Sequence, residues 1–452
     1  MARLLVVSNR VPDLTDRAGG LAVALADALA PGSLWFGWSG RQLSERSEAI
    51  GTVQAEGISY ATIDLSENDY RAFYLGFSNG TLWPLFHMLP SFVKFNGTDY
   101  EAYQYVNKLF ATALAKLLTP DDLIWIHDYQ LLGVAAELRE LGIHHRIGFF
   151  LHIPFPAPAL FETLPPAAEL FKKILAHDLI GFQTEQDKAH FLETARMYHL
   201  DVRDDMIVHA GRTIRLVVIP VGINYKIFNQ MAVRAVSRVE ARRVVESLAG
   251  RTLMIGADRL DYTKGLPARF DAYGRFLTTY ASQRRHINYL QIAAPSREEA
   301  EKYKSLREEL DYKVGTINGA FSDFDWVPLR YMTRTVGRGL LAGLFRISRI
   351  GLVTPLRDGM NLVAMEYIAA QPEDDPGVLI LSRFAGAATL LPEALQVNPY
   401  DADTFADAIS KALTMSRAER IERHTALRAQ IQKYDDATYS RKFLAALRDT
   451  NS

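Results

Sequence analysis

The chain carries LMIGADRLDYTKG at residues 253–265 and PLRDGMNLVAME at residues 355–366. Each stretch is predicted to leave a buried strand and enter a helix through a loop that contains charge and glycine. The first loop supplies two fixed cations, Arg259 and Lys264, and the second places Asp358 and Glu366 on either side of a helix start. Cations and a helix dipole can hold phosphates, and carboxylates can accept hydrogen bonds from sugar hydroxyls. Together the two stretches predict a cradle for a sugar diphosphate.

Short apolar runs alternate with longer amphipathic runs along the rest of the chain, which is typical of parallel sheets wrapped by helices. The expected strands lie at residues 4–7, 123–126, 147–151, 179–182 and 214–219 in the first half, and at 252–257, 287–293, 350–354, 378–382 and 396–397 in the second. Unusual polar residues follow nearly every one of these strands, at the edge where open α/β sheets bind ligands. We predict an α/β fold with two doubly wound domains that face each other across a cleft.

Proline and glycine in IPVGI at residues 219–223 interrupt the series of strands and predict a domain boundary. We expect an N-terminal, acceptor-binding domain over residues 1–223 and a C-terminal, nucleotide-sugar-binding domain over residues 224–433. A capping box at residues 416–419 starts a predicted helix over 417–433. The last segment, residues 434–452, is expected to form a helix that packs back on the N-terminal domain.

The composition excludes several classes of protein. With 452 residues, of which 48% are hydrophobic and 23% charged, the chain is globular and long enough for two domains. Lys and Arg number 51 against 52 Asp and Glu, so no net charge attracts nucleic acid or a membrane. The absence of cysteine excludes disulfides and fits a reducing compartment. Because the first apolar run is too short for a signal peptide or a membrane span, we expect a cytoplasmic protein.

Paired glycines and an arginine follow the first predicted strand. Arg10 ends the strand, and Gly19 and Gly20 open the next helix. A glycine pair lets backbone N–H groups approach a phosphate, although an ordinary helix cap accounts for the same residues. Arg10 is either a ligand-binding cation or half of a surface ion pair.

Aromatic residues and histidines gather in the other predicted loops. Trp38, Tyr74 and Trp83 stand near glycine or polar residues, and they are either core residues or a wall on which a sugar ring stacks. Asp128 and His152 follow two buried strands. These two side chains can bond sugar hydroxyls or transfer a proton, and a structural role is the alternative for each.

Cations, not a metal ion, are expected to stabilise a departing diphosphate in this chain. Arg259 and Lys264 are five residues apart across one loop, so both can neutralise the charge that grows on the leaving group. Arg297 has the corresponding position after the next strand, where an exposed arginine at a helix start is the alternative interpretation. The histidines lack the spacing of metal ligands, and no Asp-x-Asp pair follows a strand. We therefore expect no metal and no other cofactor.

With these segments in place, the chain closely resembles the trehalose-6-phosphate synthase family, retaining glycosyltransferases with the GT-B fold of two Rossmann-like domains. The resemblance extends from the first strand to about Leu447, and its motifs occur in the family's order. They are SNR at 8–10, AGGL at 18–21, WFGWSG at 35–40, LWP at 82–84, FH at 86–87, WIHDY at 125–129, GFFLHIPFP at 148–156, RLDYTKG at 259–265, LRDGMNLVAME at 356–366, FAGA at 384–387 and NPYD at 398–401. The resemblance is specific because many motifs agree at once.

The resemblance implies transfer of glucose, with retention and without metal, from UDP-glucose to glucose 6-phosphate, which gives α,α-trehalose 6-phosphate and UDP. The implied acceptor site consists of Arg10, Tyr74, Trp83, Asp128 and Arg297, with the two arginines on the phosphate. The implied donor site consists of Gly19, Gly20, Trp38, His152, Arg259, Lys264, Val336, Asp358, Gly359, Met360, Asn361, Leu362, Val363, Ala364, Met365 and Glu366. The implied catalytic residues are Asp128, His152, Arg259, Lys264, Asp358 and Glu366. The leaving phosphate is expected to help deprotonate the acceptor, so no enzyme nucleophile is required.

The partners implied by the resemblance are the nucleotide sugar, the sugar phosphate and further copies of the chain, as a dimer or tetramer. Two departures from the family pattern bear on the nucleobase of the donor. Met365 stands where the family usually has lysine, and Val336, Gly337 and Arg338 stand where members often have Phe-Asp-Arg. The preference among UDP-, GDP- and ADP-glucose therefore stays open. Because the chain ends soon after the resemblance does, no fused phosphatase domain is expected.

Two other functions fit parts of the same pattern. A pseudo-glycosyltransferase that joins cyclitols would keep the phosphate cradle. A non-catalytic protein that senses sugar phosphates would keep the fold but lose charged residues of the site. Every charged residue of the implied set is present, which favours an enzyme over a sensor.

Overall fold

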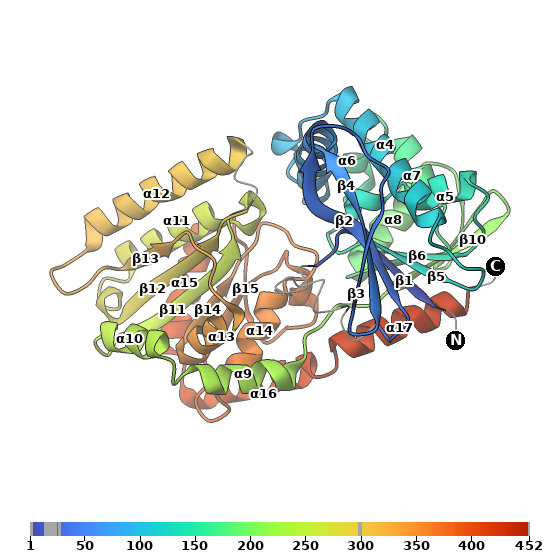
Figure 1. Cartoon of the computed structure of the whole chain (residues 1–452). Coiled ribbons are helices and arrows are strands. Elements are labelled where there is room, and N and C mark those ends of the chain that lie inside the picture. Colours follow the sequence, from blue (N-terminus) through green and yellow to red (C-terminus); the bar gives the residue numbers. More distant parts are fainter. Residues whose placement is uncertain (1–2, 13–24, 26–28, 297–300, 451–452) are drawn as a thin grey trace. The chain divides into compact units, whose positions relative to one another are not determined.

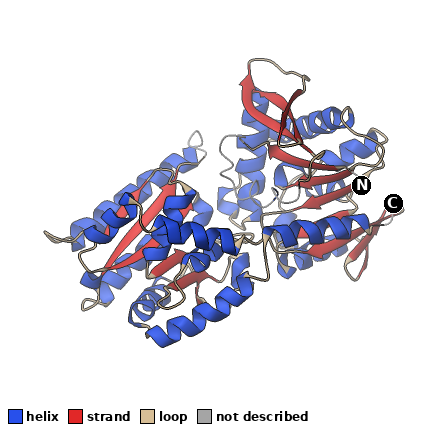
Figure 2. Cartoon of the chain, turned by 60° about the horizontal axis from the view of Figure 1, so that its bottom comes forward, coloured by secondary structure: helices blue, strands red, loops and turns tan. Residues whose placement is uncertain are grey.

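The computed structural model of the chain describes residues 3–12, 25, 29–296 and 301–450. The chain divides into two compact units (Figure 1). Unit 1 consists of Met1–Val221 together with Asp436–Ser452, and unit 2 is the single segment Gly222–Asp435. Each unit has its own sheet, and Figure 2 shows helices on both sides of the strands in each. The α/β fold class predicted from the sequence is confirmed.

The described residues of unit 1 contain a ten-stranded sheet in the order β3-β4-β2-β1-β5-β6-β7-β10-β9-β8. The strands are β1 (Leu4–Arg10), β2 (Leu34–Leu43), β3 (Gly51–Ala55), β4 (Ile58–Ser66), β5 (Leu123–His127), β6 (Arg146–Phe150), β7 (Leu179–Phe182), β8 (Asp201–Arg203), β9 (Met206–His209) and β10 (Arg212–Val218). The central strands from β4 to β10 pair in parallel, and the pairings of β3, β8 and β9 are antiparallel. Parallel strands aligned in this way bring their following loops to one edge of the sheet.

The described residues of unit 2 contain a six-stranded, fully parallel sheet in the order β13-β12-β11-β14-β15-β16. Its strands are β11 (Thr252–Arg259), β12 (Ile287–Ala294), β13 (Leu329–Met332), β14 (Ile350–Val353), β15 (Val378–Ser382) and β16 (Leu395–Val397). The strand order reverses between β11 and β14, which are neighbours in the sheet but about ninety residues apart in sequence. In open α/β sheets such a reversal opens a crevice at the carboxyl ends of the strands.

Helices connect most of these strands. Unit 1 has α2 (Glu67–Asp69), the π-helix η1 (Tyr70–Leu82), α3 (Trp83–Phe86), η2 (Pro90–Phe92), α4 (Gly97–Ala115), η3 (Tyr129–Leu131), α5 (Val134–Glu140), α6 (Pro158–Phe161), α7 (Ala167–Ile174), α8 (Glu185–Met197) and α17 (Asp436–Arg448). Unit 2 has α9 (Tyr225–Ala235), α10 (Val239–Ser247), η4 (Tyr262–Lys264), α11 (Leu266–Thr279), η5 (Arg284–His286), α12 (Glu301–Phe321), α13 (Arg338–Ile347), α14 (Leu362–Ala370), η6 (Gly386–Thr389), α15 (Ala402–Thr414) and α16 (Arg417–Ile431). None of the helices within the described residues contains a stretch long and apolar enough to cross a membrane.

Helix α17 packs against the sheet of unit 1. The Phe443 ring stacks on Trp125 at a centroid distance of 4.6 Å. Glycine is required beneath this ring, because a Cβ atom at Gly148 would lie 2.7 Å from Phe443 Cε1 and one at Gly181 would lie 2.9 Å from Phe443 Cε2. The end of the chain thus belongs to the hydrophobic core of unit 1.

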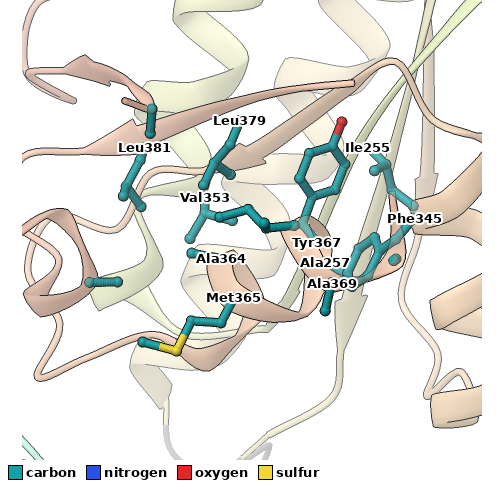
Figure 3. Close-up of a cluster of buried hydrophobic side chains, with 14 of the residues drawn as sticks. Ile255, Ala257, Phe345, Val353, Ala364, Met365, Tyr367, Ala369, Leu379 and Leu381 are labelled. Atoms are coloured by element: carbon teal, nitrogen blue, oxygen red, sulfur yellow. The ribbon is translucent and has the colours of Figure 1, made fainter. Parts of the chain in front are cut away.

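The core of unit 2 lies where α13 and α14 pack on β11, β14 and β15 (Figure 3). Phe345, Tyr367 and Leu379 are buried in this cluster, and Met365 is fully buried beside them. Apart from Glu366, α14 contains only apolar residues and tyrosine, and most of its residues are buried. This burial holds the start of α14 at a fixed position on the sheet.

All ten strands predicted from the sequence are present, with ends that differ by at most three residues. Strands β2, β3, β4, β8, β9 and β13 were not predicted from the sequence. Most of these lie toward an edge of their sheet, where a strand needs no continuous apolar run. The predicted helix over 417–433 corresponds to α16, which ends at Ile431.

Candidate active site

The loop from β11 to α11 presents two cations at the carboxyl edge of unit 2. Arg259 is exposed at the end of β11, and Lys264 lies in η4. The chain turns at Gly265, which has a φ of 67° and would bring a Cβ atom within 2.8 Å of Thr354 O. Only glycine adopts this conformation readily in so little space. Lys264 Nζ forms an ion pair with the carboxylate of Asp358, and both side chains are nearly buried.

The second loop carries Asp358 to the start of α14. Asn361 Nδ2 donates a hydrogen bond of 3.0 Å to Asp358 Oδ2. Asn361 has the left-handed backbone conformation, with φ 77°, and directly precedes Leu362 in α14. The first N–H groups of a helix have no carbonyl partner within it, so they favour an anion there. The cation Lys264, the carboxylate Asp358 and a helix N-terminus therefore meet at this edge.

The loop after β15, which contains Gly386 and Ala387, fixes the position of the segment before α14. Gly386 N donates to Asp358 O at 3.1 Å, and Ala387 N donates to Met360 O at 2.9 Å. The two loops touch so closely that a Cβ atom at Gly386 would lie 1.8 Å from Gly359 O. The backbone around Asp358 is consequently fixed by hydrogen bonds and by steric contact.

Glu366 lies one turn into α14 and is paired with a cation. Arg338 donates to Glu366 Oε1 from Nε at 3.2 Å and from Nη2 at 2.9 Å. Burial raises the pKa of the Glu366 carboxyl, and the nearby Arg338 guanidinium opposes this shift. Met365 points into the core, whereas Val336 is only partly buried at the rim of the same cluster. The two departures from the family pattern thus lie beside the Arg338–Glu366 pair.

A buried arginine supports the cationic loop from below. The Arg269 side chain is fully buried, and its Nη1 donates to Asp258 Oδ2 at 2.6 Å and to Gln291 Oε1 at 2.9 Å. Its Nε donates to Thr354 Oγ1 at 2.9 Å, and its Nη2 donates to Lys264 O at 3.3 Å. Arg269 therefore joins the ends of β11, β12 and β14 to the loop that bears Lys264. The sequence analysis missed this residue.

Aromatic rings form a continuous row at the carboxyl edge of unit 1. Arg10 Cζ lies 5.8 Å from the centre of the Trp38 ring, within cation–π range. Trp38 and Tyr70 have ring centroids 5.3 Å apart, and Tyr70 and Tyr74 have centroids 5.5 Å apart. Gly40, at φ 92°, leaves room for the arginine, because a Cβ atom there would lie 2.7 Å from Arg10 Nη2.

Hydrogen bonds extend this row toward Trp83. Asn79 Nδ2 donates to Tyr74 O at 2.7 Å, and Asn79 Oδ1 accepts a bond of 2.7 Å from the Tyr129 hydroxyl. The Tyr129 ring lies 5.5 Å from the Trp83 ring. Four residues predicted from the sequence, Arg10, Trp38, Tyr74 and Trp83, thus belong to one connected group.

Asp128 and His152 lie at the ends of β5 and β6. Asp128 has a φ of 73°, an uncommon conformation for a residue with a side chain, and its Oδ1 accepts a bond of 3.3 Å from His152 N. His152 Nε2 lies 3.1 Å from His127 Nδ1, within hydrogen-bond distance. Burial lowers the pKa of His152 to about 3 and that of His127 well below its usual value. At neutral pH both rings are uncharged, so His152 can form hydrogen bonds but is not a ready proton donor.

The structure places the remaining predicted residues as follows. Gly19, Gly20 and Arg297 lie outside the described residues. Leu362, Val363 and Ala364 form the first turn of α14, and Gly359 and Met360 precede it. Within the described part of the chain, no group of three or more His, Asp or Glu side chains is arranged to hold a metal ion.

Two Rossmann-like sheets, one with cations and a helix N-terminus at its carboxyl edge and one with aromatic and polar groups there, have the architecture of the two-domain glycosyltransferases. Comparison with known families agrees with this class. The family model of glycosyltransferase family 20 matches residues 4–449, and the chain belongs to this family.

Individual relatives are similar over nearly their whole length. The trehalose-6-phosphate synthase of Sinorhizobium fredii is 43% identical over 454 residues, which cover 98% of each chain. A crystal structure of the α,α-trehalose-phosphate synthase (UDP-forming) from Burkholderia xenovorans, in complex with glucose-6-phosphate, has a TM-score of 0.95 at 42% identity and covers 99% of this chain and 100% of that one. A structure from E. coli bound with UDP-2-fluoro glucose has a TM-score of 0.95 at 44% identity and covers 99% of each chain.

Proposed function

We propose that this protein transfers glucose, with retention, from UDP-glucose to glucose 6-phosphate and so forms α,α-trehalose 6-phosphate and UDP. The observation that carries the proposal is the group formed by Lys264, Asp358 and Asn361 at the start of α14. It combines a cation for a diphosphate with polar groups for a sugar. Relatives of this family at 42–44% identity bind glucose-6-phosphate in one structure and UDP-2-fluoro glucose in another.

Arg259 and Lys264 are the proposed diphosphate-binding cations. In the reaction, the bond between glucose C1 and the diphosphate oxygen breaks, and negative charge grows on that oxygen. Fixed cations stabilise this charge without having to reorganise. Lys264 is already held beside Asp358, so a bound diphosphate shares a cation whose position is set in advance.

Asp358 and Glu366 are the proposed partners of the donor's hydroxyl groups. Asp358 Oδ2 already accepts from Lys264 and Asn361, which orients the carboxylate. Glu366 is oriented in the same way by Arg338. The donor site is completed by Gly19, Gly20, Trp38, His152, Val336, Gly359, Met360, Leu362, Val363, Ala364 and Met365.

The proposed acceptor site uses charge for the phosphate and rings for the sugar. Arg10 and Arg297 bind the phosphate, because a guanidinium offers two parallel hydrogen bonds to an oxyanion. Tyr74, Trp83 and Asp128 bind the glucose. An acceptor hydroxyl then forms the new bond to C1 on the face that the diphosphate leaves, and its proton passes to a leaving phosphate oxygen.

Several further properties belong to the same proposal. The reaction needs no metal ion, the protein works in the cytoplasm, and it assembles as a dimer or tetramer. The domain division used for the site assigns residues 1–223 mainly to the acceptor and residues 224–433 mainly to the donor. No enzyme nucleophile takes part.

The decisive experiment gives the purified protein glucose 6-phosphate with UDP-, GDP- or ADP-glucose in turn, with and without excess EDTA. The expected products are trehalose 6-phosphate and the nucleoside diphosphate, identified by mass and by the α,α configuration in NMR spectra, at equal rates with and without EDTA. Glucose without phosphate is expected to be a poor acceptor. No product with any of the three donors would overturn the proposal, and product only from cyclitol substrates would favour the pseudo-glycosyltransferase. Loss of activity in EDTA that magnesium or manganese restores would overturn metal independence.

A further inference from the structure

A pocket lined by several cationic side chains lies at the opposite edge of the sheet of unit 1. It has a volume of about 640 Å³. Arg146 is the first residue of β6, Arg212 is the first residue of β10, and Asp178 directly precedes β7. These three strands are parallel neighbours, so all three residues mark the amino-terminal edge. His152 follows the other end of β6, and the strand itself spans roughly 13 Å.

The lining of this pocket is strongly basic. It includes Arg139, Arg146, Lys172, Arg212 and Asp178. Four of these side chains are permanent cations and one is a carboxylate. The chain as a whole carries nearly equal numbers of both signs, so this excess is local. Clustered cations repel one another unless an anion lies between them.

One of the four cations has a structural task. Arg139 donates to the carbonyl oxygens of Ala176, Ile143 and His145, and its Nη2 lies 2.9 Å from Asp178 Oδ2. Arg139 therefore joins the segments that follow α5 and α7 to the start of β7. This structural role explains why Arg139 lies in the pocket and why Asp178 is there to neutralise it. It does not explain the presence of the other three cations.

The other three cations keep donors available to a ligand. Arg212 shares Asp178 through Nη2 at 2.5 Å, and its side chain is 32% exposed. Within the described part of the chain, neither Arg146 nor Lys172 has an ion-pair partner, and Lys172 is exposed. By contrast, the adjacent Lys173 is paired with Glu137 at 3.0 Å. Two of the four lining cations, Arg146 and Lys172, thus have no ion-pair partner among the described residues.

We propose that this pocket binds a small organic phosphate that carries at least two negative charges. Arg146, Lys172 and Arg212 bind the phosphate oxygens, and the aliphatic side chains of Ala136 and Leu175 contact the organic part. The volume lies within the range of about 300–1,000 Å³ that is usual for small-molecule sites. A nucleic acid is the poorer candidate, because the cations line one compact pocket and not an extended surface.

The test measures binding of inorganic pyrophosphate and of phenyl phosphate to the full-length protein by isothermal titration calorimetry. The pocket variant is Arg146→Ala/Lys172→Ala, and the comparison variant is Arg259→Ala/Lys264→Ala, which removes the cations of the donor loop. We expect the pocket variant to bind either probe at least about tenfold more weakly at one site, since each lost charged hydrogen bond has an effect of that size. The donor-loop variant is expected to keep this site.

Two controls make the outcome unambiguous. Lys108→Ala removes an exposed lysine of α4 outside the pocket, and it should bind both probes as the wild type does. Arg146→Lys keeps the charge and should recover part of the affinity. Unchanged binding in the pocket variant, or loss of all binding in the donor-loop variant alone, would refute the proposal without affecting the proposed transferase activity. Inorganic phosphate, measured in the same way, has nearly the same charge as phenyl phosphate, so if it binds as tightly as phenyl phosphate, the organic part of the ligand gains nothing from the apolar wall and that part of the proposal is wrong.

Discussion

The carboxyl edges of the two sheets use different interactions. In unit 2, charged side chains are paired and partly buried, as in Lys264 with Asp358 and Arg269 with Asp258. In unit 1, rings stack on one another and on Arg10, and the buried His152 carries no charge at neutral pH. A diphosphate needs cations held in place, whereas a sugar needs flat surfaces and directed hydrogen bonds. This difference is consistent with the proposed function, in which unit 2 binds the diphosphate and unit 1 binds the acceptor sugar.

The side chains at the two sheet edges also differ in the packing and hydrogen bonds that they need from the surrounding protein. A buried charge is stable only with a close partner and further hydrogen bonds. Rings are stabilised by burial itself and tolerate small displacements. We therefore expect substitutions at the edge of unit 2 to have larger effects than substitutions at the edge of unit 1, and four experiments test this order.

The largest effect is expected for Arg269→Met, which leaves Asp258 buried without its cation. Removing one partner of a buried pair costs about 3–5 kcal/mol in the free energy of unfolding. Urea unfolding followed by circular dichroism measures the change. Arg275→Ala, which breaks an exposed ion pair with Asp403, is the control and should cost less than about 1 kcal/mol. Adding Asp258→Asn to Arg269→Met should restore part of the stability, and a further loss of stability in that double variant would contradict our account.

Lys264→Ala and Arg259→Ala should each lower kcat by about a hundredfold or more, equivalent to about 3 kcal/mol of barrier. The physical reason is the loss of a fixed charge beside the leaving diphosphate. Steady-state rates with saturating substrates measure the effect, and circular dichroism checks the fold. Lys411→Ala, at an exposed position of α15, is the matched control and should leave kcat unchanged. Near-normal turnover in both loop variants would remove these cations from the reaction.

A smaller effect is expected for Arg10→Ala and Arg297→Ala, which should each raise the KM for glucose 6-phosphate by roughly tenfold or more. Binding of the nucleotide sugar alone should change little. Arg41→Ala, in an exposed pair with Asp64 on the neighbouring strand, serves as the control. If both variants keep a normal KM for the acceptor but lose donor binding, these arginines belong to the nucleotide site.

The smallest effect concerns pH. Burial lowers the pKa of His177 to about 3, far below its value in the unfolded chain. The unfolded chain therefore binds a proton below about pH 6.5 that the folded protein does not, so stability falls as the pH falls from about 6.5 toward 3. At pH 5.5 the loss is about 1 kcal/mol relative to pH 8. Urea unfolding of His177→Asn at both pH values should show a pH dependence smaller by this amount, and an unchanged dependence would contradict the argument.

The sequence predicted best what depends on local pattern. Buried strands such as β14 and β15 are nearly continuous apolar runs, so their positions follow from the sequence alone. Strand β2 was missed because Trp38 suggested a ligand wall, although Trp38 is buried in this strand. Strand β3 is almost entirely exposed at the sheet edge, so no apolar pattern marks it.

For the candidate site, the sequence predicted that the loops at 258–265 and 355–361 follow buried strands, but not which of their side chains pair. Lys264 and Asp358 are 94 residues apart, and their contact depends on the strand order of the sheet. Arg269 lies in an amphipathic helix where an arginine is usually exposed, and nothing local indicates that it is buried. Asp258, a carboxylate at the end of a buried strand, was the one signal that a buried cation was needed nearby.

The contact between Gly386 and Gly359 limits how the proposed donor site can be redesigned. Because the two backbones meet with no space for a side chain, residues 356–366 and 384–387 form one module for protein engineering. A chimera that takes the first segment from a relative with another nucleotide preference must also take the second. Recombination libraries with a crossover between residues 366 and 384 should therefore yield fewer folded proteins than libraries that exchange both segments together.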